Sequence, residues 1–146
     1  MKSKTILYVG ILCLLLGGIF FYKTTFQEMP LIQSKYNYFL GDIGVYEKDW
    51  PIYILDQLNE EEKNEVISLL SECSIKKTFD KTIGKTENGM IYSIFLHQDG
   101  VSSSDMYYIG ITEDIGYCSN GGKYYILKYE DDFKLKLQNI IENRSN

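Results

Sequence analysis

Hydrophobic and polar positions follow several different patterns along the chain, and the longest uniform stretch comes near its start. Residues 5–22 carry no charged side chain, and residues 1–4 before them include two lysines. As a helix, this stretch extends about 27 Å, which is close to the thickness of the hydrocarbon layer of a bilayer. We therefore predict a transmembrane anchor over residues 5–22, preceded by a cytoplasmic basic leader over residues 1–4.

The charges around this stretch predict its orientation. Lys2 and Lys4 precede it and only Lys23 directly follows it, so the leader is expected to stay in the cytoplasm while the remainder is exported. The alternative is a cleaved signal peptide, whose apolar core is usually shorter and ends in small residues. Here the run ends in the aromatic residues 20–22, which suit the membrane interface, and the sequence therefore favours an uncleaved anchor.

Residues 23–49 show no sustained hydrophobic period and include Pro30, Gly41 and Gly44. This pattern predicts a juxtamembrane connector, followed by a single extracytoplasmic domain over residues 50–146 with one hydrophobic core. Residues 50–55 form a short β candidate at the start of that domain. Pro51 is compatible with the start of a strand or with an edge strand only, because proline cannot donate to a ladder.

A helix is predicted after Asn59, which can cap it. Residues 60–62 are three glutamates in the first turn, where the helix dipole favours anions, and Glu62 stands three residues after the cap. Apolar residues then recur at helical spacing at Val66, Leu69, Leu70 and Cys73. The glutamates could also form a binding cluster, but their capping role accounts for them fully.

Between residues 74 and 129 the hydrophobic period changes to two. The β candidates are Ile75–Phe79, Met90–His97, Met106–Thr112, Ile115–Cys118 and Lys123–Tyr129. The links between them contain turn residues such as Asn88-Gly89 and Asp99-Gly100, which are typical of hairpins. We therefore predict an antiparallel β-meander of four to five strands.

A closing helix is predicted to begin near residues 131–132 and to run towards Arg144. Its apolar face consists of Phe133, Leu137, Ile140 and Ile141. The predicted fold class is α+β: an N-terminal transmembrane helix, then the meander flanked by two amphipathic helices. The helices are expected to cover one face of the sheet, and the other face is expected to stay open.

Charge narrows the range of partners. The chain has 15 basic and 20 acidic residues, and without Lys2, Lys4 and Lys23 the exported part keeps 12 basic against 20 acidic, a net charge of −8. This balance excludes nucleic acid as a natural partner and disfavours contact with anionic lipid headgroups. A protein partner with a basic surface fits better. The single arginine among the basic residues suggests an AT-rich bacterial gene.

Two cysteines remain outside the anchor, Cys73 and Cys118. In an oxidising compartment they are a disulfide candidate. The bond would close a loop of 46 residues and stabilise the folded state by at most about 4 kcal/mol. In a reducing environment both would stay as buried thiols. The sequence leaves these two alternatives open.

No motif in the chain carries recognisable catalytic or metal chemistry. His97 is the only imidazole, and the cysteines and His97 lack the spacing of a zinc site. Residues 102–104 are three serines on a predicted turn, without the Gly-x-Ser-x-Gly sequence of a nucleophile elbow. We therefore expect that the protein is not an enzyme and that it has no catalytic residue, no bound metal and no cofactor.

The candidate binding residues are tyrosines of the predicted sheet: Tyr107, Tyr108, Tyr124 and Tyr125. Tyrosine offers a large contact area and a hydroxyl at low entropic cost, which suits a recognition surface. The simpler interpretation is that tyrosine has a high β-propensity and fills a half-buried sheet. Strand alternation places the members of each adjacent pair on opposite faces, and the sequence does not tell which face is exposed.

These features predict a membrane-anchored extracytoplasmic domain that binds a protein. The layout resembles small membrane-tethered immunity proteins, which protect bacteria from toxins acting at the cell envelope. That resemblance implies an inhibitor with a short anchor, an acidic α+β domain and in some cases one disulfide. The alternatives are an accessory subunit of a cell-envelope machine for secretion or division, and a small-ligand or lipid-binding domain.

Overall fold

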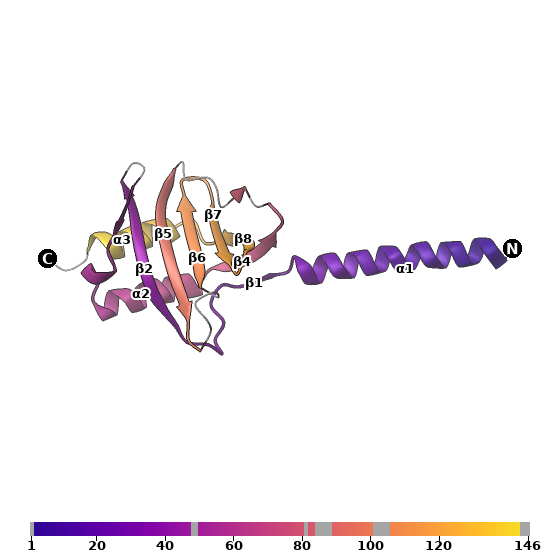
Figure 1. The fold of residues 1–146 in the computed structure, drawn as a ribbon, viewed down its shortest axis with the longest axis horizontal. Coiled ribbons are helices and arrows are strands. Elements are labelled where there is room, and N and C mark those ends of the chain that lie inside the picture. Colours follow the sequence, from indigo (N-terminus) through magenta and orange to yellow (C-terminus); the bar gives the residue numbers. More distant parts are fainter. Residues whose placement is uncertain (1, 48–49, 81, 84–88, 101–105, 144–146) are drawn as a thin grey trace.

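The structure is a computed structural model that describes residues 2–47, 50–80, 82–83, 89–100 and 106–143. These residues form three α-helices, one short 3-10 helix and a single antiparallel sheet of eight strands (Figure 1). The predicted α+β class is therefore confirmed. The serines at 102–104, Asn88 of the predicted turn and Arg144 lie outside the described residues.

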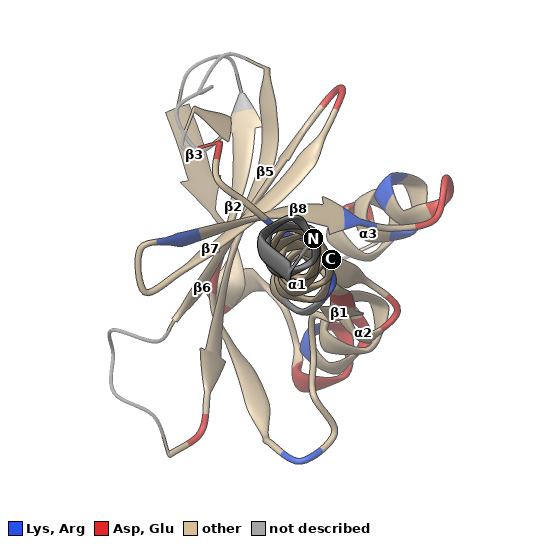
Figure 2. Cartoon of the chain, turned by 90° about the vertical axis from the view of Figure 1, so that its right-hand side faces the viewer, with Lys and Arg blue, Asp and Glu red and all other residues tan. Residues whose placement is uncertain are grey.

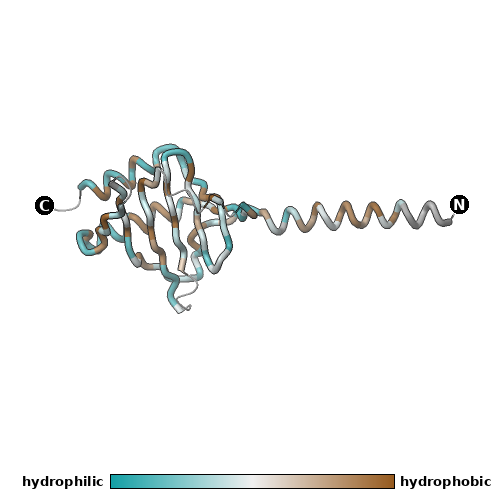
Figure 3. The backbone as a smooth tube through the Cα atoms, turned by 45° about the horizontal axis from the view of Figure 1, so that its top comes forward, coloured by the Kyte–Doolittle hydropathy of each residue, from teal (hydrophilic) through white to brown (hydrophobic). Residues whose placement is uncertain are grey.

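Helix α1 spans Lys2–Thr25 and extends away from the rest of the molecule (Figure 1). The predicted helix over residues 5–22 lies within it. Large hydrophobic side chains between Tyr8 and Tyr22 are exposed, and hydrophobic residues recur on successive turns (Figure 3). Within the described part of the chain, no helix combines the length and the apolarity that a membrane span requires. The side chains of residues 2–7 lie outside that part, and the transmembrane character of residues 5–22 stays a prediction.

The sheet has the strand order β1-β4-β8-β7-β6-β5-β2-β3. Its strands are β1 (Glu28–Pro30), β2 (Tyr38–Glu47), β3 (Trp50–Tyr53), β4 (Ser74–Thr78), β5 (Met90–Gln98), β6 (Tyr107–Thr112), β7 (Gly116–Asn120) and β8 (Lys123–Lys128). The prediction of four to five strands was wrong in number, because the described residues form eight. The five strands expected between residues 74 and 129 are all present, and the β candidate over residues 50–55 is confirmed as β3. Strands β1 and β2 are additional.

The stretch predicted as a connector supplies these two additional strands, β1 and β2. Glycines interrupt the hydrophobic alternation of β2 and hide it in the sequence. A Cβ at Gly41 would collide with the His97 ring, and a Cβ at Gly44 would lie 2.5 Å from the Ser93 hydroxyl oxygen. The glycines therefore allow β2 to pair closely with β5, and a register shift between Leu40 and Asp42 accommodates the extra residue.

Strand β3 forms one edge of the sheet and pairs only with β2. Ile54, directly after it, donates its N–H to the Ile43 carbonyl oxygen at 2.9 Å. Because backbone groups alternate in direction along a strand, Pro51 and Tyr53 turn theirs away from β2. Proline has no N–H, so the outward edge of β3 lacks a donor at Pro51.

Helices α2 (Glu60–Ser71) and α3 (Phe133–Glu142) lie together on one side of the sheet (Figures 1 and 2). The 3-10 helix η1 (Leu55–Gln57) leads from β3 into α2. The predicted apolar stripe of α2 is confirmed, because Val66, Leu69, Leu70 and Cys73 are all buried. On α3, Phe133, Leu137 and Ile141 are buried, and Ile140 packs against them at the margin of the core.

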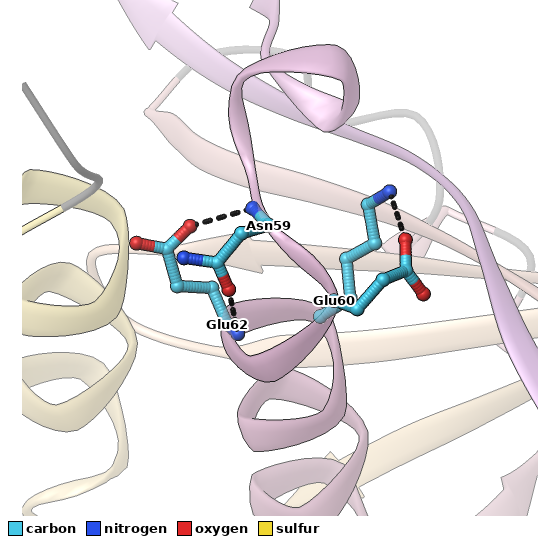
Figure 4. A network of polar contacts seen from close by, with 4 residues as sticks. Asn59, Glu60 and Glu62 are labelled. Carbon is cyan, nitrogen blue, oxygen red and sulfur yellow. Dashed lines mark hydrogen bonds and ion pairs between the residues drawn. The ribbon is translucent and has the colours of Figure 1, made fainter.

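The predicted cap of α2 is present as a complete capping box (Figure 4). Glu62 donates its backbone N–H to the Asn59 side-chain oxygen at 2.9 Å, and Asn59 donates its own to the Glu62 carboxylate at 2.8 Å. Glu60 accepts from the Lys63 ammonium at 2.8 Å. Two of the three glutamates therefore have local roles in the first turn of α2.

Candidate functional site

The face of the sheet opposite α2 and α3 is here named the open face, because neither helix covers it (Figure 2). On β5, Tyr92, Ile94 and Leu96 point into the core below the helices, and the residues between them point to the open face. Through the strand register the open face includes Phe39, Gly44, Tyr46, Tyr53, Ser93, Phe95, His97, Tyr108, Gly110, Tyr117, Ser119, Tyr124 and Ile126.

The structure divides the four predicted tyrosines between the two faces. Tyr108 and Tyr124 share one cross-strand row of the open face, since both pair with Ser119 of β7. Tyr107 and Tyr125 face the core, where Tyr125 is buried opposite Cys118. Burial, with smaller contributions from nearby groups, raises the pKa of Tyr107 to about 12. The four tyrosines therefore do not form one surface.

Five aromatic side chains of the open face, here named the aromatic row, form two groups of ring contacts: the pair Phe39 and His97, and the group Phe95, Tyr108 and Tyr117. The Phe39 and His97 rings are stacked with centroids 5.0 Å apart and planes 4° apart. The Tyr108 ring lies 5.1 Å from that of Phe95 and 6.0 Å from that of Tyr117. Such ring pairs stabilise a surface beyond the area they bury, and they hold it in one arrangement.

Glycine permits the centre of this row to lie close to the sheet. A Cβ at Gly110 would collide with the ring of Tyr117, which crosses the backbone of β6 at that point. The neighbouring Tyr108 is half-buried as a result. Burial, followed by the hydroxyls of Tyr117 and Tyr46, raises the pKa of Tyr108 well above its ordinary value. The Tyr108 hydroxyl is therefore neutral at pH 7, and the Tyr117 ring beside it is buried, with 2% of its surface exposed.

Exposed hydrophobic side chains lie on strands β2 and β3, at one end of the open face. Phe39 is 51% exposed and Tyr53 is 53% exposed, and Trp50 at the edge of the sheet is 79% exposed. Aromatic residues with this exposure are enriched in protein interfaces. The sequence reasoning missed Phe39 because it lies in the predicted connector. The signal that could have found it is the alternation from Tyr38 to Tyr46, with the glycines taken as neutral.

Acidic residues gather on the helical side of the molecule. Glu61, Glu62 and Glu65 line a cleft of about 360 Å³ between α2 and α3, together with polar residues of α3. On the open face, the Asp42 carboxylate accepts a hydrogen bond from the Ile43 backbone N–H at 2.8 Å. Three acidic side chains therefore lie together on the helical side, while Asp42 pairs in register with Phe95 of the aromatic row.

Cys73 and Cys118 are both free and buried, so the predicted disulfide is absent from the described structure. Cys73 lies just before β4, and Cys118 lies on β7, with β8 between those strands. Strands two positions apart are separated by roughly 10 Å, beyond the Cα separation of about 4.4–6.8 Å that a disulfide spans. Cys73 instead donates to the Leu69 carbonyl oxygen at 3.7 Å, and burial raises the pKa of its thiol to about 12.

His97 has a packing role in the aromatic row through its stacking on Phe39. Among the residues that the structure describes, no three metal-ligating side chains come together. The geometry around His97 is that of a stacked ring pair at the rim of a sheet.

Comparison of the chain with protein-family models, with curated proteins and with solved structures finds no significant match. The surfaces described above are therefore the basis for the functional argument.

Proposed function

We propose that the chain is a membrane-anchored extracytoplasmic domain that binds a protein partner through its open face. The observation that carries this proposal is the aromatic row on a sheet face that α2 and α3 leave uncovered. A sheet that needed only to be stable would place polar side chains on such a face, in alternation with the core. Here the face holds packed rings, with Phe39 and Tyr53 exposed at one end.

The shape of this surface favours a protein over a small molecule. Binding sites for small molecules are concave and enclose most of their ligand. The Tyr108 ring contacts those of Phe95 and Tyr117, and the Tyr117 ring lies against Gly110, so these side chains pack closely on the sheet. Tyrosine hydroxyls at such a surface supply hydrogen bonds, while the rings supply the apolar contact area.

Three observations support the anchor. Residues 5–22 carry no charge, and α1 as a whole has 24 residues, a length of about 36 Å. Its hydrophobic side chains point in all directions around the helix, whereas a surface helix has one apolar stripe. The lysines before residue 5 favour a cytoplasmic N-terminus, and the folded domain is then on the outer side of the membrane.

Within this class, we favour an inhibitor or immunity protein against a toxin that acts at the cell envelope. An inhibitor of this kind needs a rigid binding surface that is held near the place of attack. The open face offers the surface, and the proposed anchor would hold it at the membrane. Its partner would cover the exposed rings of Phe39 and Tyr53 with an apolar patch of its own.

The test is a competition between a bacterium that encodes the protein and its deletion mutant. We expect the mutant to be killed in co-culture with its parent and to be rescued by the full chain. The variant with Phe39→Ser and Tyr53→Ser is expected to lose at least tenfold in survivors. The matched control is Leu135→Ser, because Leu135 is 59% exposed on α3 and lies away from the open face.

Each outcome bears on a different part of the proposal. Equal survival of mutant and parent, under conditions in which the toxin is made, would remove the immunity function. A mutant that is killed but is rescued equally by the double variant would show that protection does not use the open face. In that case the acidic cleft becomes the surface to vary, with Glu61→Lys and Glu65→Lys.

A further inference from the structure

A second surface lies where α1 meets the folded domain, and it differs in charge from the rest of the molecule. A cavity of about 430 Å³ opens there between the segment that follows α1 and strands β4 and β8. Thr25 and Gln27 line it on one side. Lys77, Lys123 and Tyr125 line it on the other. Because Thr25 is the last residue of α1, the cavity directly adjoins the end of that helix.

The cavity is basic, although the domain is acidic. Glu28 also lines it, but its carboxylate accepts hydrogen bonds from the Lys128 ammonium at 2.7 Å and from the Ser74 hydroxyl at 2.5 Å. Within the described residues, no carboxylate forms an ion pair with Lys77 or Lys123. Lys128 balances the one acidic group, and the two other ammonium groups leave a local excess of positive charge.

Aromatic contacts connect this surface to the proposed anchor. The Tyr22 and Phe26 rings are 5.0 Å apart, and the Phe26 ring contacts that of Phe79 edge-on at 5.0 Å. Phe79 lies directly after β4 and is 68% exposed. The Lys77 ammonium is 5.8 Å from the centre of the Phe79 ring. An exposed phenyl ring therefore stands beside an ammonium group at the end of the domain that is nearest α1.

We propose that this surface docks on the membrane, with Phe79 in the interfacial layer and an anionic lipid phosphate between Lys77 and Lys123. The inference rests on the proposed anchor. The uncharged run ends at Tyr22, and the headgroup layer beyond it is roughly 5–8 Å thick. Two successive ring contacts of 5.0 Å connect Tyr22 to Phe79 through Phe26, so the Phe79 ring lies at most about 10 Å from the Tyr22 ring. Aromatic rings and lysines are the side chains that favour this depth.

The docking surface changes the expectation that followed from net charge. The exported part has a net charge of −8, which disfavours anionic lipids if the charge is spread evenly. A membrane surface potential decays within a Debye length of about 8 Å, so only the nearest side chains experience it. The charged side chains beside the end of α1 include Lys77 and Lys123, and the Glu28 carboxylate there is paired with Lys128. Three glutamates of α2 line a different cavity.

The experiment uses the single tryptophan of the chain as a depth probe. The full chain is reconstituted in vesicles of phosphatidylcholine, with or without one quarter phosphatidylglycerol, that carry bromine on the acyl chain near the headgroup. In the variant Trp50→Phe with Phe79→Trp, we expect strong quenching of the emission, and more of it in the anionic vesicles. The unaltered chain is the internal control, because Trp50 lies on β3, at the opposite edge of the sheet from β1.

Lysine variants then test the charge recognition. Lys77→Gln with Lys123→Gln is expected to lower the equilibrium constant for docking about 30-fold in anionic vesicles. Lys35→Gln with Lys63→Gln makes the same change in net charge outside the cavity and is expected to leave quenching unaltered. Quenching that is equal in both lipid mixtures and insensitive to Lys77 and Lys123 would overturn the headgroup site.

Flotation with the vesicles after alkaline washing separates this proposal from the anchor. A chain that floats but shows no quenching at position 79 overturns the docking and leaves the anchor standing. A chain that does not float overturns the anchor and the docking together. A chain that floats, is quenched at position 79 and responds to the lysine variants supports both.

Discussion

At the scale of single residues, the packing of rings on the open face depends on a glycine. Tyr117 crosses the β6 backbone at Gly110, where any Cβ would enter its ring. Tyr108 then packs against Tyr117 on one side and Phe95 on the other. The aromatic row is therefore determined as much by a missing side chain as by those present, and glycine in a central strand has a specific reason here.

We predict that Gly110→Ala destabilises the domain by about 1–3 kcal/mol, because the added methyl group displaces the Tyr117 ring. The free energy of unfolding measured in urea tests this. In a Tyr117→Ala background, the same substitution is expected to cost much less, since the collision is gone. Equal costs in both backgrounds would show that the strain lies in the backbone of β6.

At the scale of elements, α2 and α3 lie where local sequence signals predicted helices. Two strands of the sheet, β1 and β2, were not predicted by any local signal. Fifteen consecutive residues encode both the capping box of Asn59 and Glu62 and the apolar stripe of α2, which runs from Val66 to Cys73. Strand β2 owes its existence to β5, more than forty residues later, and β1 owes its existence to β4. No local pattern contains that information, so these strands were missed.

The candidate site shows the same division. Strand alternation correctly separates Tyr107 from Tyr108 and Tyr124 from Tyr125. Which member faces outward depends on where α2 and α3 pack, and this is a tertiary fact. Phe39 could not be assigned to a surface before β2 was known as a strand, and Tyr53 lay in a predicted strand whose pairing partner was unknown.

For α2 we predict that Asn59→Ala lowers the free energy of unfolding by about 1 kcal/mol, because the Glu62 backbone N–H loses its side-chain acceptor. Thermal or urea unfolding measures the change. Asn64→Ala on the same helix is the control, since Asn64 is exposed and does not belong to the capping box. A variant with both Asn59→Ala and Glu62→Ala is expected to cost less than the sum of the single changes.

At the scale of the whole molecule, three surfaces of different chemistry occupy different sides. The open face is aromatic, the helical side is acidic, and the end beside α1 is basic around Lys77 and Lys123. Net charge and composition average over all three. This is why the composition predicted an acidic domain correctly while giving no indication of the lysines near the end of α1.

Tyrosines and cysteines that are buried or partly buried determine how the stability of the domain depends on pH. Burial is the largest cause of each upward pKa shift at Tyr92, Tyr107, Tyr108, Tyr125, Tyr129, Cys73 and Cys118. A raised pKa means that the folded state holds these protons more tightly than the unfolded state. Stability is therefore fully present up to about pH 8.5, above which the unfolded thiols titrate, and it is lost as the pH rises towards 12.

Unfolding in urea between pH 7 and pH 11 tests this expectation. We expect a constant free energy of unfolding up to about pH 8.5 and a steady decline above it. Cys73→Ala is expected to make the decline shallower, because the pKa of that thiol moves from about 9 to about 12 on folding. A stability that stays level to pH 11 would contradict the burial of these groups.

The edge strand β3 has a consequence for a protein tethered to a surface. Molecules confined to two dimensions meet their own copies far more often than the same number free in solution, and sheet edges are the parts that join most readily. Pro51 removes a donor from the outward edge of β3, and the β1 edge is only three residues long and ends in Pro30. The sheet therefore resists growth at both ends. If the proposed anchor holds the chain in a membrane, neighbouring copies can stay separate molecules there, each with its open face free.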